Sequence, residues 1–379
     1  MTESRKLHFL VASYMAGGMG TIHDNLFSMI SDRDDIDASE IPVHLEPASM
    51  GVPWSKELKF SPSLIPGTIR NSAITRQGIQ EYERQGIRFD AAYYSQHTII
   101  TFLRSFRKRV PFLLAMDGTP LFYHKYGLWY AHPYFEPESI TARVKHRITK
   151  SIYHQAFHLL PLSNLVKQSL MEDYGIPENR ITVVPPPIDL RSWLCPERTS
   201  ASQANRPIHV LFVGTEFSRK GGDLLVKVAT SDEFSEVHFH FVTRNYEGPA
   251  SDNIHVYADL QSNTEPLLDL YRTADIFIQP TRADTHSVAA LEAMAMGLPV
   301  LATNVGGIAD IIVEGETGYF IQMDDVQNMS DRLRDLVEDP ALRLRMGQNG
   351  RSRVEEHFNL QHISDKIVAL LKDASASRS

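Results

Sequence analysis

The chain has 379 residues, of which 42% are hydrophobic and 22% are charged. Because one hydrophobic core rarely keeps growing over such a length, we expect two globular domains. The net charge of −8 comes from the second half, since residues 1–190 carry +1 and the remainder −9. An acidic chain without a basic stripe is a poor candidate for phosphate-backbone binding, so we expect no nucleic-acid partner.

The first half alternates predicted strands with helices. Leu7–Ser13 predicts a buried strand, Gly17–Gly20 a turn and Thr21–Ile30 a helix, which is how a doubly wound domain begins. Arg5 and Lys6 precede the first strand as they would in a signal peptide, but the apolar stretch is short and a buried strand is favoured. Further strands of the same sheet are predicted at 91–94, 112–115 and 159–162.

The second half repeats this alternation after a break. Pro185–Pro187 stiffens the chain, and residues 195–206 are polar without apolar periodicity. Strands are then predicted at 208–213, 237–242, 254–257, 276–279 and 299–302, and helices at 221–229, 266–274 and 287–296. Strands that alternate with helices form a parallel sheet covered on both faces. Each half therefore predicts a Rossmann-like, doubly wound α/β domain.

These breaks predict how the chain is divided. We expect a first domain over residues 1–190, a linker over 191–206, a second domain over 207–355 and a C-terminal helix within 356–379. The helix itself is predicted over His357–Lys372, where apolar residues recur near the spacing of one helix face. They are Phe358, Ile363, Ile367, Leu370 and Leu371.

Cysteine content and hydropathy indicate the compartment. Cys195 is the single cysteine of the chain, which therefore cannot form an internal disulfide or a cysteine-rich zinc site. No run of about 18 apolar residues occurs, so we expect no transmembrane segment. A reducing, cytoplasmic location fits both observations.

The most specific motif covers residues 274–320, which read ADIFIQPTRADTHSVAALEAMAMGLPVLATNVGGIADIIVEGETGYF. Seven residues separate Asp284 from Glu292, and an Ala-Met-Ala segment, a Gly-x-Pro-Val segment and paired glycines follow. The glycines are Gly306, Gly307, Gly315 and Gly318. This order resembles the donor-binding core of the retaining glycosyltransferases of family four, which have the two-domain GT-B fold. The resemblance implies that Glu292 accepts hydrogen bonds from the nucleotide ribose and that Asp284 holds hydroxyls of the donor sugar.

The helix that carries Glu292 begins close to Asp284. The first backbone N–H groups of a helix have no partner within the helix and carry partial positive charge, so they stabilise an anionic diphosphate. His286, Ser287 and Val288 stand at this helix start and are candidates for binding the donor.

A second motif, VLFVGTEFSRKGGDLL, covers residues 210–225. It resembles the family segment in which an Arg after the first glycine and a Lys five residues later clamp the diphosphate. Lys220 has the Lys position, where its charge would stabilise the departing phosphate. Thr215 replaces the Arg, which is a departure from the family pattern. Arg219 is a candidate to supply the missing charge to the donor.

Two elements of the first domain are further candidates. Gly17 and Gly18 lie in a glycine-rich turn that in the family faces the donor phosphates, although a tight strand-to-helix turn explains them nearly as well. The third glycine of a dinucleotide fingerprint is absent, because His23 occupies its place. Asp117 follows a predicted strand at the sheet edge where α/β proteins bind ligands, so it is a candidate catalytic residue.

Pairs that resemble metal ligands are interpreted as structural. Asp35 and Asp37 lie in the charged segment 32–40, which we interpret as a solvated loop. His154 and His158 share a helical spacing but lack a third ligand nearby in the sequence. We expect no metal and no cofactor. Residues 104–150 carry a local charge of +6, which suits either a surface for anionic lipid or a solvated face.

The resemblance implies two Rossmann-like domains facing across a cleft, with the acceptor in the first domain, the nucleotide sugar in the second and the last helix crossing back to the first. The expected reaction is transfer of a sugar from a nucleotide sugar with retention at the anomeric carbon. A UDP-sugar is the first candidate donor and a GDP-sugar the second. The expected acceptor is a carbohydrate, a lipid-linked molecule or a small molecule. Two alternatives stay open: a sugar-nucleotide epimerase on the same fold, and a non-catalytic protein that binds nucleotide sugars.

Overall fold

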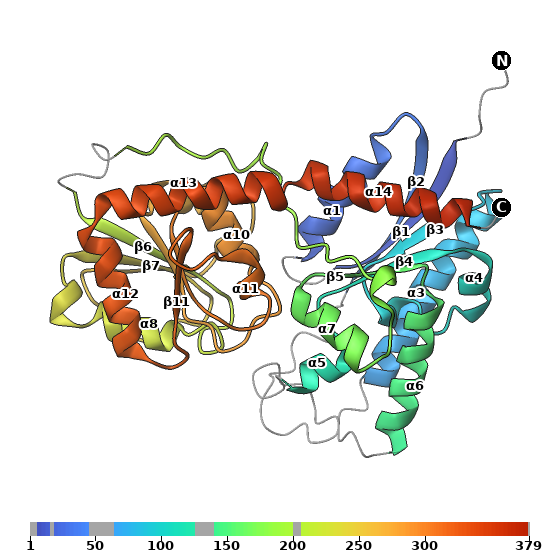
Figure 1. Ribbon diagram of the computed structural model, residues 1–379, viewed down its shortest axis with the longest axis horizontal. Coiled ribbons are helices and arrows are strands. Elements are labelled where there is room, and N and C mark those ends of the chain that lie inside the picture. Colours follow the sequence, from blue (N-terminus) through green and yellow to red (C-terminus); the bar gives the residue numbers. More distant parts are fainter. Residues whose placement is uncertain (1–5, 16–18, 45–63, 126–139, 200–205, 378–379) are drawn as a thin grey trace. The chain divides into compact units, whose positions relative to one another are not determined.

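The computed structural model describes residues 6–15, 19–44, 64–125, 140–199 and 206–377. The chain divides into two compact units, an N-terminal unit of Met1–Pro185 with Leu360–Ser379 and a C-terminal unit of Pro186–Asn359. Each unit is built on one parallel sheet (Figure 1). Among the described residues, no helix is both long and apolar enough to cross a bilayer.

In the N-terminal unit, the described strands form a five-stranded parallel sheet in the order β2-β1-β3-β4-β5. The strands are β1 (Leu7–Met15), β2 (Ile36–His44), β3 (Ala91–Tyr94), β4 (Phe112–Met116) and β5 (His158–Pro161). The α-helices are α1 (Met19–Ser31), α3 (Leu64–Arg84), α4 (Arg104–Arg109), α5 (Pro120–Lys125), α6 (Ile140–Gln155), α7 (Asn164–Glu172) and α14 (Leu360–Ala376). After β2 the chain continues on the other side of β1, so the switch point of the sheet lies between β1 and β3.

The segment interpreted above as a solvated loop, residues 32–40, contains the first half of β2. Ile36, Ile41 and Val43 are buried, whereas Asp37 between them is exposed. β2 lies at the edge of the described sheet, where charged residues protect an open backbone edge. The charges dominated the sequence pattern and hid the apolar alternation of the strand.

Both faces of this sheet are buried, and the C-terminal helix covers one of them. Alternate residues of β1 enter two different clusters, Leu10 on one face and Phe9 on the other. α14 lies on the second face beside α1 (Figure 1). Its buried apolar residues in that cluster are Ile363, Ile367, Val368, Leu371 and Ala374. The last helix therefore completes the core of the N-terminal unit.

The predicted C-terminal helix starts later than its apolar pattern indicated. α13 (Pro340–His357) ends at His357, and α14 begins at Leu360. Phe358, which the pattern assigned to the last helix, is buried in the core of the C-terminal unit. Apolar spacing continues across the break between the two helices, so periodicity alone cannot locate it.

We expect Leu371→Ala to destabilise the N-terminal unit by about 2–5 kcal/mol, because Leu371 is fully buried and its truncation leaves a cavity under α14. Denaturant unfolding measures the change. Leu370→Ala is the matched control, since Leu370 is only partly buried beside the same cluster. Equal losses of stability in the two variants would contradict the packing described here.

In the C-terminal unit, the described strands form a six-stranded parallel sheet in the order β11-β10-β9-β6-β7-β8. The strands are β6 (Ile208–Val213), β7 (Val237–Val242), β8 (Ile254–Tyr257), β9 (Ile276–Gln279), β10 (Val300–Thr303) and β11 (Gly318–Ile321). The α-helices are α8 (Gly222–Ala229), α9 (Glu265–Thr273), α10 (Val288–Ala295), α11 (Ile308–Ile311), α12 (Val326–Glu338) and α13. The switch point of this sheet lies between β6 and β9.

The C-terminal unit is one continuous segment whose two ends meet. The backbone N–H of Ile188 donates to the carbonyl oxygen of Phe358 at 2.7 Å, and both side chains are buried in the same cluster. The N-terminal unit, in contrast, consists of two segments that are separated in sequence by the whole C-terminal unit.

Candidate active site

The loops that carry Lys220 and Asp284 follow β6 and β9, the two strands that flank the switch point. The loops are in backbone contact, because the N–H of Arg282 donates to the carbonyl oxygen of Arg219 at 2.9 Å. Gly221 has a φ of +78°, and a Cβ there would lie 2.0 Å from the carbonyl oxygen of Pro280. The glycine therefore permits the close approach that brings the two sequence motifs together.

Lys220 and Asp284 form an ion pair at this edge of the sheet. Their side chains are 14% and 7% exposed, so the two charges are largely withdrawn from water. Charges in such an environment need a partner of opposite charge, and here Lys220 and Asp284 are partners of each other. The sequence assigned both residues to the donor but gave no sign that they contact each other.

Arg219, the candidate replacement for the family Arg, is bound by an acidic neighbour. Its Nε and Nη2 donate to the two carboxylate oxygens of Glu216 at 2.9 and 2.7 Å. Nη1 donates to the carbonyl oxygen of Ala283 at 2.7 Å. The guanidinium thus fastens the β6 loop to the β9 loop, and its charge is shared with Glu216.

Arg282 is a structural cation of the site that the sequence reading did not identify. It donates to both carboxylate oxygens of Asp223 at 2.7 and 2.8 Å and through Nε to Asp324 at 2.6 Å. It also donates to the carbonyl oxygen of Ser218. These contacts hold the start of α8 and the β6 loop in a fixed position beside Asp284.

Ser287 is the N-cap of α10. Its Oγ accepts from the N–H of Ala290 at 3.1 Å and donates to Oε1 of Gln279 at 2.5 Å. Nε2 of Gln279 donates in turn to the carbonyl oxygen of Val213 at 3.0 Å. The start of α10 is therefore tied to the ends of both switch-point strands, and its free N–H groups have a fixed direction.

His286 and Val288 flank this cap. Val288 is the first residue of α10 and is partly exposed. His286 is 8% exposed, and neither of its ring nitrogens has a hydrogen-bond partner among the described residues. Burial lowers its pKa to about 3, so the imidazole is neutral at physiological pH. A neutral, unsatisfied imidazole is a ready donor or acceptor for a polar ligand.

Glu292 lies on α10, where its small neighbours Ala289 and Ala293 leave room for close approach. Tyr271 on α9 donates its hydroxyl to Oε2 of Glu292 at 2.8 Å. Burial raises the pKa of Glu292 to about 7, and the hydrogen bond from Tyr271 opposes this rise. The sequence predicted Glu292 as a ligand of the donor but gave no signal for Tyr271, which lies 21 residues away.

Affinity for a nucleoside diphosphate is expected to fall as the pH drops through about 7, because protonated Glu292 loses its capacity to accept two ribose hydroxyls. Tyr271→Phe removes a bond that favours the carboxylate, so it should move this transition to higher pH. Calorimetric titrations of UDP across this pH range measure both effects. In Glu292→Gln, the remaining pH dependence of UDP affinity should come only from the titration of the phosphate itself, near pH 6. A wild-type pH profile in Glu292→Gln would contradict the assignment.

The paired glycines pack directly on the acidic loop. Gly306 has a φ of +58°, and a Cβ there would lie 1.5 Å from the carbonyl oxygen of Asp284. The N–H of Gly307 donates to the carbonyl oxygen of Thr285 at 3.0 Å. The loop after β10 therefore packs directly against the backbone of Asp284, and this contact explains why no side chain fits at Gly306.

Three predicted residues belong to the N-terminal unit. Asp117 directly follows β4 and is partly buried, and burial raises the pKa of its carboxyl group. A hydrogen bond from Tyr123 acts in the opposite direction. Gly17 and Gly18 lie outside the described residues. Lys220, Asp284 and Glu292 belong to the C-terminal unit.

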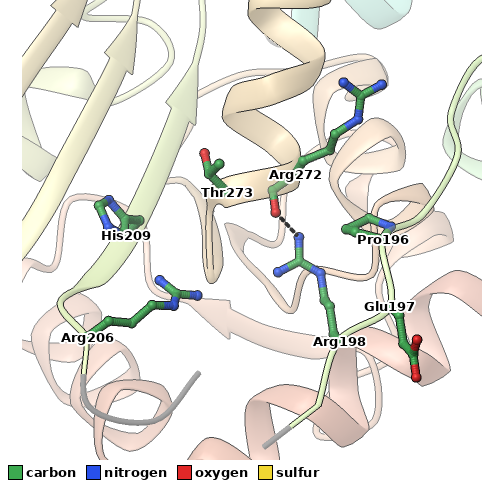
Figure 2. Close-up of a pocket in the computed structure, with 7 residues that line it drawn as sticks. All are labelled: Pro196, Glu197, Arg198, Arg206, His209, Arg272 and Thr273. Carbon is green, nitrogen blue, oxygen red and sulfur yellow. Dashed lines mark hydrogen bonds between the residues drawn. The ribbon is translucent and has the colours of Figure 1, made fainter. Parts of the chain in front are cut away.

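A pocket of about 380 Å³ lies elsewhere on the C-terminal unit (Figure 2). It is lined by Pro196, Glu197, Arg198, Arg206, His209, Arg272 and Thr273. His209 stands near the amino end of β6, so the pocket is at the edge opposite Lys220. Its arginines are engaged: Arg198 donates to the carbonyl oxygen of Arg272 at 3.1 Å, and Arg206 pairs with Asp275. We do not assign this pocket to the donor.

Among the described residues, no group of three or more His, Cys, Asp or Glu side chains is arranged to hold a metal ion. Asp35 instead pairs with Lys372. His154 bonds the carbonyl oxygen of Tyr174 at 3.0 Å, and His158 bonds the hydroxyl of Thr182 at 2.8 Å.

Two comparisons of the sequence identify its relatives. The family model for glycosyl transferases group 1 matches residues 197–353, and the model for glycosyltransferase family 4 matches residues 50–192. D-inositol 3-phosphate glycosyltransferase of Pseudarthrobacter chlorophenolicus is 28% identical over 229 residues, which are 56% of this chain and 54% of that protein. The chain spans about half, or less, of the length of the curated relatives that it matches.

Solved structures share the fold at low sequence identity. Sucrose-phosphate synthase of Thermosynechococcus elongatus has a TM-score of 0.73 at 16% identity, over 98% of this chain and 100% of that one. HepE of Anabaena, solved in complex with UDP-glucose, has a TM-score of 0.67 at 13% identity, over 97% and 100% of the two chains. Two parallel-sheet units of this kind are the GT-B architecture, and the two family models together match most of the sequence. The chain belongs to the family four, or group 1, glycosyltransferases.

Proposed function

We propose that the protein transfers a sugar from a nucleotide sugar to an acceptor hydroxyl with retention at the anomeric carbon. One observation carries the proposal. The switch point of the second sheet brings together a lysine, two carboxylates and the capped start of a helix. They come from two loops and one helix: Lys220, Asp284, and Ser287 with Glu292 on α10. Open α/β sheets bind ligands at this place.

The roles of these residues follow from their chemistry. Lys220 would stabilise the diphosphate as negative charge develops on it, and α10 would direct its first N–H groups at the same phosphates. Glu292, braced by Tyr271, would accept ribose hydroxyls. Asp284 would accept hydroxyls of the donor sugar. Because Lys220 and Asp284 are paired with each other, an incoming diphosphate would compete with Asp284 for the lysine and release the carboxylate toward the sugar.

In the proposed reaction the bond from the anomeric carbon to the diphosphate oxygen breaks, and a bond from that carbon to the acceptor oxygen forms on the same face. The proton of the acceptor hydroxyl passes to the leaving phosphate. Lys220 supplies the positive charge, so we propose that no metal and no cofactor take part. Asp117 is our candidate for a catalytic residue on the acceptor side.

We propose a UDP-sugar as the donor and a GDP-sugar as the second choice. The fold shared with HepE, which was solved with UDP-glucose, supports this order. The acceptor would be a carbohydrate, a lipid-linked molecule or a small molecule, and the location cytoplasmic, with peripheral contact to the inner face of a membrane. Binding of a sugar nucleotide to the folded state raises the midpoint of thermal unfolding by mass action. Measuring this midpoint with each member of a panel of sugar nucleotides therefore ranks the candidate donors.

The reaction itself is tested with the donor that stabilises most. A transferase releases free nucleotide faster when an acceptor from a panel of glycans and lipid-linked sugars is added, and NMR of the product gives its anomeric configuration. An epimerase would convert the nucleotide sugar to its epimer without any acceptor. A binding protein would be stabilised and would do neither. Either of the last two outcomes would overturn the proposed transfer.

A further inference from the structure

α6 presents a row of aliphatic side chains to solvent. Ile140, Val144 and Ile148 are 78%, 49% and 42% exposed. They recur every fourth residue, so they lie within about 80° of one another around the helix. Single exposed aliphatic residues are common on protein surfaces, whereas a contiguous row of them marks a surface that contacts an apolar phase or a partner. We call these three residues the apolar row.

The orientation of the row is fixed by the opposite side of the helix. Ala142, Thr149, Ile152 and Tyr153 are buried, and Ile152 and Tyr153 belong to the core cluster of the N-terminal unit. Rotation of α6 to cover the row would expose these core residues instead. Among the described residues, the row therefore lies on the side of α6 that faces away from the core of this unit.

Basic residues flank the row, and α6 contains no acidic residue. Arg143 and Arg147 are exposed beside it, and Lys145 and Lys150 are partly exposed farther round the helix. α4 adds the exposed Arg104 and Lys108. The Nη1 of Arg107 donates to Oε1 of Gln155 at 2.7 Å, which joins α4 to the end of α6. Positive charge thus flanks an aliphatic row in a chain whose net charge is negative.

We propose that α6 is the surface by which this protein docks on a bilayer that contains anionic phospholipid. The apolar row would enter the boundary between headgroups and acyl chains, and Arg143 and Arg147 would contact lipid phosphates beside it. Both features are those of a helix that lies in the membrane interface. A nucleic acid would be attracted by the charges but would gain nothing from three aliphatic side chains, so the row favours the membrane.

The proposal is tested by co-sedimentation of the full-length chain with vesicles, in the absence of nucleotide sugar. Vesicles of phosphatidylcholine are compared with vesicles that also contain phosphatidylglycerol. We expect binding only to the anionic vesicles, and weaker binding as salt is raised from about 0.1 M to about 1 M, because the screening length falls from about 10 Å to about 3 Å. The result is independent of transfer activity, so failure of this proposal and failure of the proposed function are distinguishable.

Two sets of variants separate the apolar from the electrostatic contribution. Ile140→Ser with Val144→Ser and Ile148→Ser should weaken vesicle binding at least about tenfold. The matched control replaces three exposed apolar residues of the C-terminal unit, Leu194, Val256 and Met323, by serine and should bind like wild type. Arg143→Glu with Arg147→Glu should weaken binding by about tenfold or more, whereas the same two positions changed to Lys should retain it.

Three outcomes would overturn the proposal. The first is wild-type vesicle binding in the triple serine variant of α6, provided that thermal unfolding confirms an intact fold. The second is equal binding to neutral and anionic vesicles. The third is binding to short duplex DNA as tight as to anionic vesicles and insensitive to the serine changes, which would make the surface a general polyanion site.

Discussion

Lys220→Ala is expected to lower the turnover number at saturating donor by about 10²-fold to 10³-fold, the usual cost of removing one preorganised group that stabilises developing charge. Donor affinity should change less, because the charge on the diphosphate grows as the bond to the sugar breaks. Steady-state rates over a range of donor concentrations give both quantities. Lys227→Ala, an exposed lysine on α8, is the control and should keep the wild-type rate.

The same substitution should also affect stability, because it leaves Asp284 withdrawn from water without its partner. A loss on the order of 3 kcal/mol is typical of a broken buried pair. Lys220→Ala combined with Asp284→Asn removes both charges and should recover most of the stability but none of the turnover. Recovery of turnover in the double variant would show that Lys220 acts on the fold and not on the leaving group.

Gly306→Ala is expected to impair the site without replacing any residue proposed to contact the donor. The new Cβ would lie 1.5 Å from the carbonyl oxygen of Asp284, so the acidic loop must move or the unit must lose stability by several kcal/mol. A displacement of about 1 Å in a catalytic group can cost about 10²-fold in rate. Rate measurements and thermal unfolding together detect both outcomes.

Gly315→Ala is the matched control for this prediction. Gly315 also has a positive φ, +76°, but a Cβ there would meet nothing within 4 Å. It should therefore cost only the conformational penalty of an alanine in the left-handed region, about 1–2 kcal/mol. If Gly306→Ala behaved like Gly315→Ala in rate and stability, the contact with Asp284 would have no functional weight.

The strands of the two sheets were largely predictable, because 112–115 is apolar throughout and 208–213 is interrupted only by His209. Strands buried on both faces need no other signal. β2 was missed since its charged residues mask a half-buried alternation. The start of α14 was misplaced because the helical spacing runs through Phe358, which enters a different core. Local periodicity reports which residues are buried but not which core receives them.

For the part of the candidate site in the C-terminal unit, the sequence indicated candidate residues but not their contacts. Lys220 and Asp284 stand 64 residues apart, and only the adjacency of β6 and β9 brings them together. Arg282 and Tyr271 had no motif of their own, because their roles are to hold Asp223 and Glu292 in place. Such supporting residues hold other side chains in position. Their contacts depend on the folded structure and leave no pattern in the sequence.

The division of the N-terminal unit into two segments has a consequence during translation. Phe9, Val11 and Tyr93 leave the ribosome early, but α14, which covers them, is made only after the whole of Pro186–Asn359. At about 5–20 residues per second, that interval lasts on the order of 10–35 s. The C-terminal unit can close only at the end of this interval, when Phe358 has been made and can meet Ile188. Throughout the interval, the apolar sheet face that α14 covers in the folded chain stays open to chaperones.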